Sequence, residues 1–381
     1  MPQLIYSADS HLVEPPQVWD RVEPRYRDRA PKVVRNPADQ PIPGEYYVFE
    51  KLKPIRVTNF FGAGQMHDKD KWEKFYAAGF ENAPPSVMDP SARLAEQDAD
   101  GVDGELIFPT MGMVILAAHD DELKAACFRA VNSYIAEYCS VDTNRLTGVG
   151  VVSMHDTDQA IKDLEDAKRI GLRGVLITGS PGEAGFGAPH LDRFWAAAQE
   201  MEMPLTMHDL QVRGEVAFTG TGLNFFMLPM EIQTALANMI VGGVFDRFPR
   251  LKVCSAENDF GWLPHFVHRL THFVTKILDK DKRLQRLPLE VIQQNVWAST
   301  QFEDGTIMEY VAKTVGSDRI MWGSDYPHPD STYPNSRDWI ARAAAHLDPS
   351  DADRIFGLNV AELYGVDIAK LKTSQRQRET A

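Results

Sequence analysis

The sequence predicts an α/β fold of the (β/α)8 TIM barrel type, in which eight parallel strands form a barrel inside a ring of helices. Three observations predict it. Short apolar runs alternate with helical segments, eight such runs occur, and Asp or His residues stand where several of them end. Alternation of strand and helix implies a parallel sheet, and eight units favour a closed barrel over an open doubly wound sheet.

The expected strands are short runs of mainly apolar residues. They cover residues 4–9, 105–108, 146–152, 174–177, 203–207, 251–255, 296–299 and 319–322. Helical spacing of apolar residues predicts helices between them, and extra helices at the C-terminus. Ser91 is expected to cap the first helix, and Gly171 to follow the end of the third. The predicted helices cover residues 92–99, 120–138, 156–170, 190–200, 228–244, 262–277 and 306–315.

A long proline-rich segment, residues 13–90, separates the first two expected strands. It is too long for an ordinary connection between a strand and a helix, so we expect a covering insertion or lid. The polar tail, residues 372–381, is expected to be frayed. The whole chain, 1–381, is therefore interpreted as one barrel domain with an N-terminal insertion.

Composition excludes several classes of protein. The 381 residues are 44% hydrophobic and 25% charged, which is ordinary for a soluble globular enzyme. The net charge of −14 provides no excess of Lys and Arg to bind a nucleic acid backbone. The most apolar long stretch, 225–245, contains Glu231 and is expected to be a buried helix rather than a membrane span. We therefore expect neither a nucleic acid nor a membrane as partner, and a small molecule as substrate.

The number and spacing of the cysteines indicate the redox state of the cellular compartment. Cys127, Cys139 and Cys254 are few, odd in number and form no close pair in sequence, which argues against a disulfide framework. The N-terminal residues lack the basic and apolar regions of a signal peptide. A reducing, cytoplasmic location is the expectation.

Four residues at expected strand ends form a candidate metal site: Asp9, His11, His208 and Asp325. Asp9 and His11 are two positions apart, so their side chains point to the same side of an extended strand. The carboxyl ends of barrel strands meet on one face, which would bring His208 and Asp325 to the same place. Two carboxylates and two imidazoles suit one divalent ion, Zn²⁺ first and Mn²⁺ as the alternative.

Further side chains near these ends are candidate proton carriers. Glu257 ends the sixth strand, His328 follows Asp325 closely, and Asp325 itself either holds the ion or moves protons. A divalent ion lowers the pKa of bound water to about 7, which makes hydroxide available at neutral pH. The alternative for Glu257 is a structural acceptor for a neighbouring N–H.

Two residues are candidates for contact with the substrate. Glu14 lies just beyond the ligand pair, and it either supports this site and orients His11 or pairs with an arginine such as Arg56. His67 lies in a glycine-rich, aromatic loop, residues 60–67, that is either a substrate lid or a plain surface loop.

The chain resembles the amidohydrolase-related (amidohydrolase 2) family, whose best-known members are aminocarboxymuconate-semialdehyde decarboxylase and γ-resorcylate decarboxylase. The resemblance covers nearly the whole chain and rests on several short motifs together. These are Asp9-Ser10-His11 with Glu14-Pro15-Pro16, Arg93-Leu94, Asp98-Ala99-Asp100-Gly101-Val102-Asp103, Gly171-Leu172-Arg173-Gly174-Val175, Pro204-Leu205-Thr206-Met207-His208, Phe248-Pro249-Arg250-Leu251-Lys252-Val253 and Gly323-Ser324-Asp325-Tyr326-Pro327-His328.

The resemblance implies a metal-bearing barrel in which Asp9, His11, His208 and Asp325 bind the ion, and often a homodimer. This chain departs from the family pattern in two places. The first ligand is commonly His or Glu rather than Asp. The decarboxylases carry a catalytic His after strand six, where this chain has Glu257. A carboxyl group replaces an imidazolium as acid only if its pKa is raised.

These observations lead to a metal-dependent hydrolase as the first expectation. It would act on a small organic acid, amide or ester, aromatic substrates included, through metal-activated water, with Asp325 and Glu257 handling protons. The alternative is a non-oxidative decarboxylase (carboxy-lyase) of an aromatic or unsaturated carboxylic acid. A third hypothesis, a metal-free binding protein on a degenerate barrel, predicts no stoichiometric metal.

Overall fold

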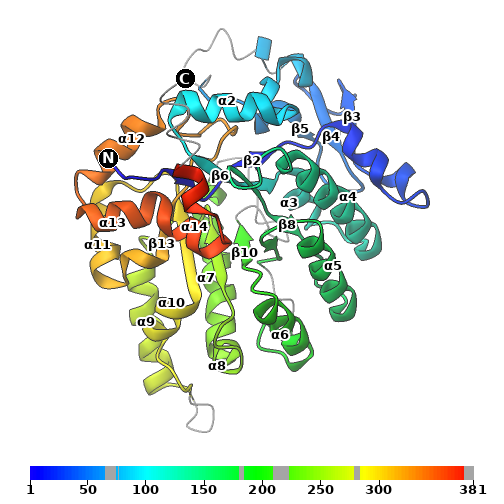
Figure 1. Ribbon diagram of the computed structural model, residues 1–381. Helices are drawn as coiled ribbons and strands as arrows, with labels where there is room; N and C mark the ends of the chain where they lie inside the picture. The colour runs from blue at the N-terminus through cyan, green and yellow to red at the C-terminus, as the bar shows by residue number, and fades with distance from the viewer. Residues whose placement is uncertain (65–73, 76, 180–183, 209–222, 279–283, 373–381) are drawn as a thin grey trace.

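The computed structural model describes residues 1–64, 74–75, 77–179, 184–208, 223–278 and 284–372. Every expected strand is present, and helices surround the strands (Figure 1). The first expected strand, residues 4–9, contains one short strand and is followed by a second that was not expected, and the third expected strand is divided into two. In chain order the strands are β1 (Tyr6–Ser7), β2 (His11–Leu12), β6 (Gly104–Pro109), β7 (Leu146–Gly148), β8 (Gly150–Val151), β9 (Val175–Leu176), β10 (Leu205–His208), β11 (Val253–Ala256), β12 (Val296–Thr300) and β13 (Ile320–Trp322).

The strands pair in parallel in two sheets. One has the order β1-β6-β2 with β7 on β6, and the other the order β13-β12-β11-β10-β9-β8. The third strand changes partners at Val149, whose N–H donates to Ile107 while the next N–H donates to Gly174. The first and last strands are also joined, because the Ala8 N–H donates to the Trp322 carbonyl at 2.8 Å. The (β/α)8 barrel is therefore confirmed, although the hydrogen-bonded ladder does not close into one continuous sheet in the described residues.

The expected helices are also present, with ends shifted by a few residues. Ser91 was wrongly expected as the first cap, because the Asp89 side chain accepts the Ser91 N–H and Ser91 lies inside the helix. Gly171 takes the expected left-handed conformation, with φ 97°. The helices between strands are α2 (Pro90–Asp100), α3 (Met111–Ile115), α4 (Asp121–Cys139), α5 (Thr157–Arg169), α6 (Asp192–Glu200), α7 (Leu223–Val241), α8 (Val244–Arg247), α9 (Leu263–Lys276), α10 (Pro288–Asn295) and α11 (Gly305–Thr314).

Helical segments also follow the last strand, as expected. They are α12 (Ser336–Ala344), α13 (Pro349–Asp353), the short π-helix η10 (Arg354–Leu358) and α14 (Asn359–Tyr364). Cys127, Cys139 and Cys254 are free and buried. Among the described helices, none combines the length and the apolar character needed to cross a membrane.

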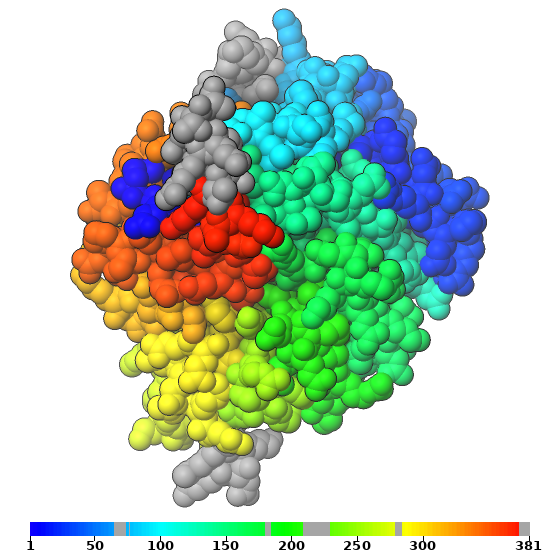
Figure 2. Space-filling view, in the orientation of Figure 1, coloured from blue at the N-terminus to red at the C-terminus, as the bar shows by residue number. Residues whose placement is uncertain are grey.

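The N-terminal insertion contains a small antiparallel sheet that the sequence did not reveal. Its order is β3 (Lys32–Arg35), β4 (Glu45–Val48) and β5 (Ile55–Arg56), and it lies at the upper right of the molecule (Figure 1). In the space-filling view the insertion and α2 form one continuous surface (Figure 2). The N–H groups of Gly62 and Ala63 donate to the Pro327 carbonyl at 3.0 and 3.1 Å, so the insertion is attached to the loop after β13.

One buried arginine links α2 to three strand segments. Arg93 is 1% exposed, and its Nε and Nη2 atoms donate to the two carboxylate oxygens of Glu105 on β6 at 2.6 and 2.9 Å. Its remaining N–H groups donate to the carbonyls of His11 and Tyr326 at 3.1 and 3.0 Å. A guanidinium is planar and always charged, so it can make all these contacts at once. Arg93 therefore fixes the ends of the first and last strands relative to each other.

Arg93→Met should lower the free energy of unfolding by about 3–5 kcal/mol, because it leaves the Glu105 carboxylate buried without its cation. Denaturant unfolding measures the change. Arg93→Met combined with Glu105→Gln should recover part of the loss. Arg169→Met is the control, because Arg169 and its partner Asp166 are exposed and the pair contributes less than about 1 kcal/mol. A loss below about 1 kcal/mol in Arg93→Met would contradict the role given to Arg93.

Candidate metal centre

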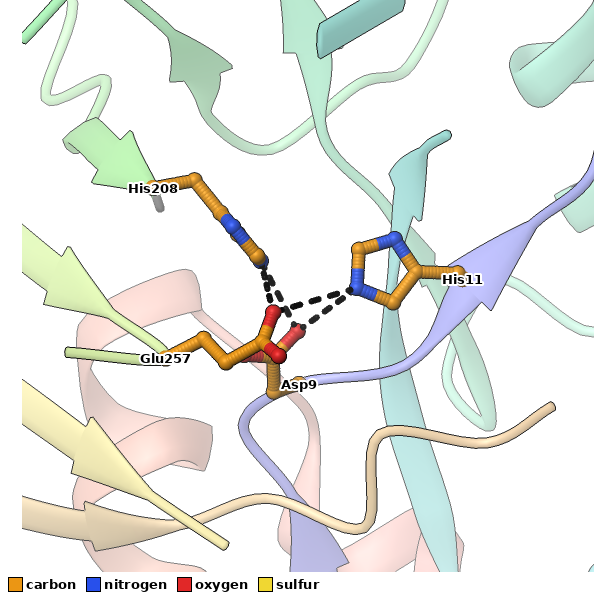
Figure 3. Close-up of side chains that lie close together, drawn as sticks. All are labelled: Asp9, His11, His208 and Glu257. Carbon is orange, nitrogen blue, oxygen red and sulfur yellow. Dashed lines mark hydrogen bonds and ion pairs between the residues drawn. The ribbon is translucent and has the colours of Figure 1, made fainter. Parts of the chain in front are cut away.

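The barrel brings the predicted ligands together at the carboxyl ends of its strands. Asp9 lies between β1 and β2, His11 begins β2, His208 ends β10, and Glu257 directly follows β11. The four side chains point toward one another (Figure 3). Asp9, His11, His208 and Asp325 are at most 1% exposed. The four residues predicted to bind a metal are thus buried together.

Asp9 is the centre of this cluster. Its Oδ1 atom lies 3.3 Å from Nε2 of His11 and 3.3 Å from Nε2 of His208. The Oε2 atom of Glu257 lies 3.5 Å from Nε2 of His208 and 4.0 Å from Nε2 of His11. One donor atom from each of these four residues lies within 4.8 Å of the others.

Asp325 and His328 extend the cluster on the other side of His11. Asp325 Oδ1 is 3.2 Å from His11 Nε2 and 2.9 Å from His328 Nδ1. The His328 ring stacks on the His11 ring, with centroids 4.0 Å apart and planes at 19°. Donor atoms of His11, Glu257, Asp325 and His328 form a second group within 4.8 Å. His11 and Glu257 belong to both groups, so the two groups form one continuous site.

The cluster fits a divalent cation by its donor types and by its spacing. Carboxylate oxygens and imidazole nitrogens are ligands for Zn²⁺ and for neighbouring divalent ions. Two ligands about 2.1 Å from a tetrahedral ion lie about 3.4 Å apart, close to the Asp9–His11 and Asp9–His208 distances of 3.3 Å. The second carboxylate oxygen of Asp9 is buried and accepts no hydrogen bond from the described residues. Buried charges in proteins are either paired or bound to a metal, so this oxygen is available to a cation.

Two residues of the cluster have an unusual backbone conformation. Glu257 and Asp325 adopt the left-handed conformation, with φ of 55° and 57°. A non-glycine residue in this region is uncommon and costs free energy, and such strain tends to be kept at functional sites. Gly323 allows the chain before Asp325 to approach the first strand, since a Cβ atom there would lie 2.4 Å from Cβ of Asp9. Close approach of the first and last strands is thus part of the geometry of the site.

Charges in the cluster affect one another strongly. Burial alone would raise the pKa of Asp9, but His208 and His11 hold it below its ordinary value. Burial raises the pKa of Asp325 to about 7, although His328 opposes this effect. Burial also lowers the pKa of His328, against the attraction of Asp325. Asp9 is therefore the firmly anionic member, whereas burial disfavours the charged forms of both Asp325 and His328.

An aromatic ring and a hydroxyl group also border the cluster. The Phe108 ring at the end of β6 lies 5.2 Å from the His208 ring and 6.1 Å from the His11 ring, centroid to centroid. Thr110 Oγ1 is 3.5 Å from Nε2 of His328. Apolar rings limit water near the imidazoles and strengthen electrostatic interactions there.

Of the two residues predicted to contact the substrate, the structure describes Glu14. Glu14 is buried, and its two carboxylate oxygens accept the N–H groups of Met111 and Gly112 at 2.8 Å each, at the beginning of α3. Burial raises its pKa to about 7 against these bonds. Among the described residues, no hydrogen bond or ion pair joins the Glu14 side chain to His11 or Arg56, and a role for Glu14 toward the substrate stays a prediction. His67 lies outside the described residues.

Sequence reasoning missed Gln301. This residue directly follows β12, is 2% exposed, and its Nε2 atom lies 3.2 Å from Glu257 Oε1 and 3.3 Å from Asp325 Oδ2. The signal was the one used for the metal ligands, a polar residue at the carboxyl end of a barrel strand. It was overlooked because a glutamine neither titrates nor commonly binds a metal.

Comparison with known proteins places the chain in a family. The amidohydrolase family model matches residues 19–366. A 2-amino-3-carboxymuconate-6-semialdehyde decarboxylase from Dictyostelium discoideum is 24% identical over 292 residues, which is 76% of this chain and 80% of the relative.

Two solved structures show the same fold. An amidohydrolase from Mycobacterium avium subsp. paratuberculosis has a TM-score of 0.78 at 22% identity and covers 97% of this chain and 100% of its own. A dihydroxybenzoic acid decarboxylase from Polaromonas sp., with bound manganese and the inhibitor 2-nitroresorcinol, has a TM-score of 0.66 at 17% identity, covering 95% of this chain and 97% of its own. Asp9 and His11 precede the matched region, so their place in the site rests on the geometry above. Since the family model spans most of the barrel, this chain belongs to the amidohydrolase family.

Proposed function

We propose that the protein is a metal-dependent, non-oxidative decarboxylase of an aromatic or unsaturated carboxylic acid. The observation that carries the proposal is the buried cluster of carboxylates and imidazoles at the barrel end, on a chain whose relatives include named decarboxylases. The hydrolase, which was the first expectation from the sequence, becomes the second candidate, because the two relatives with a named reaction are decarboxylases.

The proposed ligands are Asp9, His11, His208 and Asp325. Mn²⁺ is now the first choice of ion and Zn²⁺ the second, since the Polaromonas relative carries manganese and carboxylate-rich sites suit this ion. When bound, the ion would supply positive charge to the carboxylate of the substrate and to a neighbouring oxygen. Asp9 contributes a permanent negative charge, and His11 and His208 contribute neutral imidazole nitrogens.

The Asp325–His328 pair is proposed to provide the proton. Decarboxylation breaks the bond between the carboxylate carbon and the adjacent carbon, whose electron pair must then take up a proton. Positioned acid groups accelerate such proton transfers by about 10²–10⁴-fold. His328 Nδ1 is 2.9 Å from Asp325 Oδ1, and both side chains are buried beside His11. This pair would replace the family histidine that is absent after β11.

A specific observation favours the second candidate. Glu257 occupies the position of that histidine, and its Oε2 atom lies 3.5 Å from His208. A carboxylate there is suited to accept a proton from water that attacks a carbonyl carbon. In the hydrolase Glu257 is the general base, whereas in the decarboxylase Glu257 binds or orients, and the acid is the Asp325–His328 pair.

His208→Ala should remove most of the bound metal while the fold is kept, because it deletes one nitrogen ligand from a buried site. Elemental analysis of the purified variant measures the metal content, and circular dichroism checks the fold. His268→Ala is the matched control, since His268 is an exposed histidine on α9. Stoichiometric metal in folded His208→Ala would show that His208 is no ligand.

Isotopes distinguish the two reactions. With hydroxybenzoates and their amides as probes, we expect CO₂ release in D₂O and one deuterium on the product carbon that carried the carboxylate. No oxygen from ¹⁸O-labelled water should enter the organic product. Mass spectrometry reads both labels. Uptake of ¹⁸O without CO₂ would assign the hydrolase instead.

Two substitutions should differ in their effects on the rate. His328→Asn should lower kcat by about 10²–10⁴-fold with metal retained, because it removes the proton donor pair. Glu257→Gln should have the smaller effect in a decarboxylase and the larger effect in a hydrolase. Steady-state kinetics at matched metal content make the comparison, and a larger loss in Glu257→Gln would favour the hydrolase.

A further inference from the structure

Gln301 lies between two carboxylates that come from different loops. Its Nε2 atom is 3.2 Å from Oε1 of Glu257, after β11, and 3.3 Å from Oδ2 of Asp325, after β13. An amide nitrogen carries two hydrogens and no acceptor site. Each of these hydrogens therefore has one carboxylate oxygen as its acceptor.

The orientation of this amide follows from the chemistry of its neighbours. If the amide were flipped, its oxygen would face two carboxylate oxygens that are acceptors when ionised. Bonds from an N–H to an ionised carboxylate are about twice as strong as neutral ones. Gln301 is 2% exposed, so water does not compete freely for these positions.

The two bonds determine which oxygen of each carboxylate faces the cluster. With Oε1 of Glu257 held by Gln301, Oε2 is the oxygen nearest His208, at 3.5 Å. With Oδ2 of Asp325 held likewise, Oδ1 lies 3.2 Å from His11 Nε2 and 2.9 Å from His328 Nδ1. One oxygen of each acid is therefore assigned to the amide, and the other to the imidazole cluster.

Residues at and just after the end of β12 also form hydrogen bonds with the loop that contains Glu257. The Glu257 N–H donates to Ser299 Oγ at 3.2 Å, and Thr300 Oγ1 donates to Asp259 Oδ1 at 2.6 Å. The Glu303 carboxylate accepts the N–H groups of Phe260 and Gly261 at 2.9 and 2.7 Å. The backbone of this loop is thus held by bonds that do not involve Gln301, whereas the amide contacts the Glu257 carboxylate itself.

We propose that Gln301 is a positioning residue that assigns Glu257 Oε2 and Asp325 Oδ1 to the bound cation and its surroundings. This inference rests on the metal site of the proposed function. Two carboxylates on neighbouring loops repel each other, and a shared pair of N–H donors holds both in one arrangement. Removal of a residue that hydrogen-bonds to a metal ligand typically weakens metal affinity by about 10–100-fold.

The test compares metal affinity in wild type, Gln301→Met and Gln301→Asn. Met keeps the length and removes both donors, and Asn keeps the amide but is one methylene too short to reach both carboxylates. Competition with a chelator for Mn²⁺ should give dissociation constants about 10–100-fold weaker in both variants. The visible spectrum of the Co²⁺-loaded protein should also change in both, because a rotated carboxylate alters the ligand field.

Gln97→Met is the matched control. Gln97 is also a buried glutamine that donates to a carboxylate, with Nε2 2.6 Å from Glu105 Oε1, but it touches none of the clustered acids. It should lower thermal stability as the Gln301 variants do, while Mn²⁺ affinity and the Co²⁺ spectrum stay at wild-type values. This pattern separates positioning from a general loss of packing.

The outcomes are distinguishable. Wild-type affinity and an unchanged Co²⁺ spectrum in either folded Gln301 variant would overturn the inference and leave the metal site intact. Equal weakening in Gln97→Met would also overturn it, because the effect would then be one of stability. A wild-type protein that binds neither Mn²⁺ nor Co²⁺ would overturn the proposed function and this inference together.

Discussion

Three carboxylates and three imidazoles are held together in a space that water scarcely reaches, and this constraint governs the rest of the site. Carboxylate oxygens of Asp9 and Glu257 approach Nε2 of both His11 and His208, and Asp325 Oδ1 approaches Nε2 of His11, at distances of 3.2 to 4.0 Å. Negative charges removed from water repel one another and are tolerated when they are paired or bound to a metal. Protonation of Asp325, whose pKa is raised to about 7, relieves part of the repulsion, and a divalent cation would relieve much more.

The surrounding structure serves the same constraint. Arg93 donates hydrogen bonds to the carbonyls of His11 and Tyr326. It therefore fixes the backbone of the first strand relative to the loop after the last strand. Gly323 permits their close contact, because any larger residue would collide with Asp9. The insertion is hydrogen-bonded to Pro327, two residues after Asp325, and so contacts the chain just beyond the ligands. Fold and site are therefore linked through the backbone around the eighth strand.

Much of this arrangement could be predicted from the sequence, for identifiable reasons. The barrel strands are apolar runs with short polar ends, so residues such as Asp9, His208 and Asp325 were visible as a pattern, and barrel geometry then placed them together. The sheet β3–β5 was not visible, since its strands are short and lie in a segment rich in prolines. Gln301 was missed although it stands at a strand end. Glu14 was assigned to the site by its nearness to His11 in sequence, whereas its carboxylate accepts N–H groups at the beginning of α3. Contacts between distant segments decide such cases, and local sequence does not encode them.

The central claim is that one divalent cation lies among these acids and imidazoles. Anomalous diffraction from crystals of the Mn²⁺-loaded protein, collected above and below the manganese absorption edge, tests it most directly. The account predicts a single strong peak within bonding distance of Asp9, His11 and His208. A peak elsewhere, or none at full Mn²⁺ loading, would contradict it.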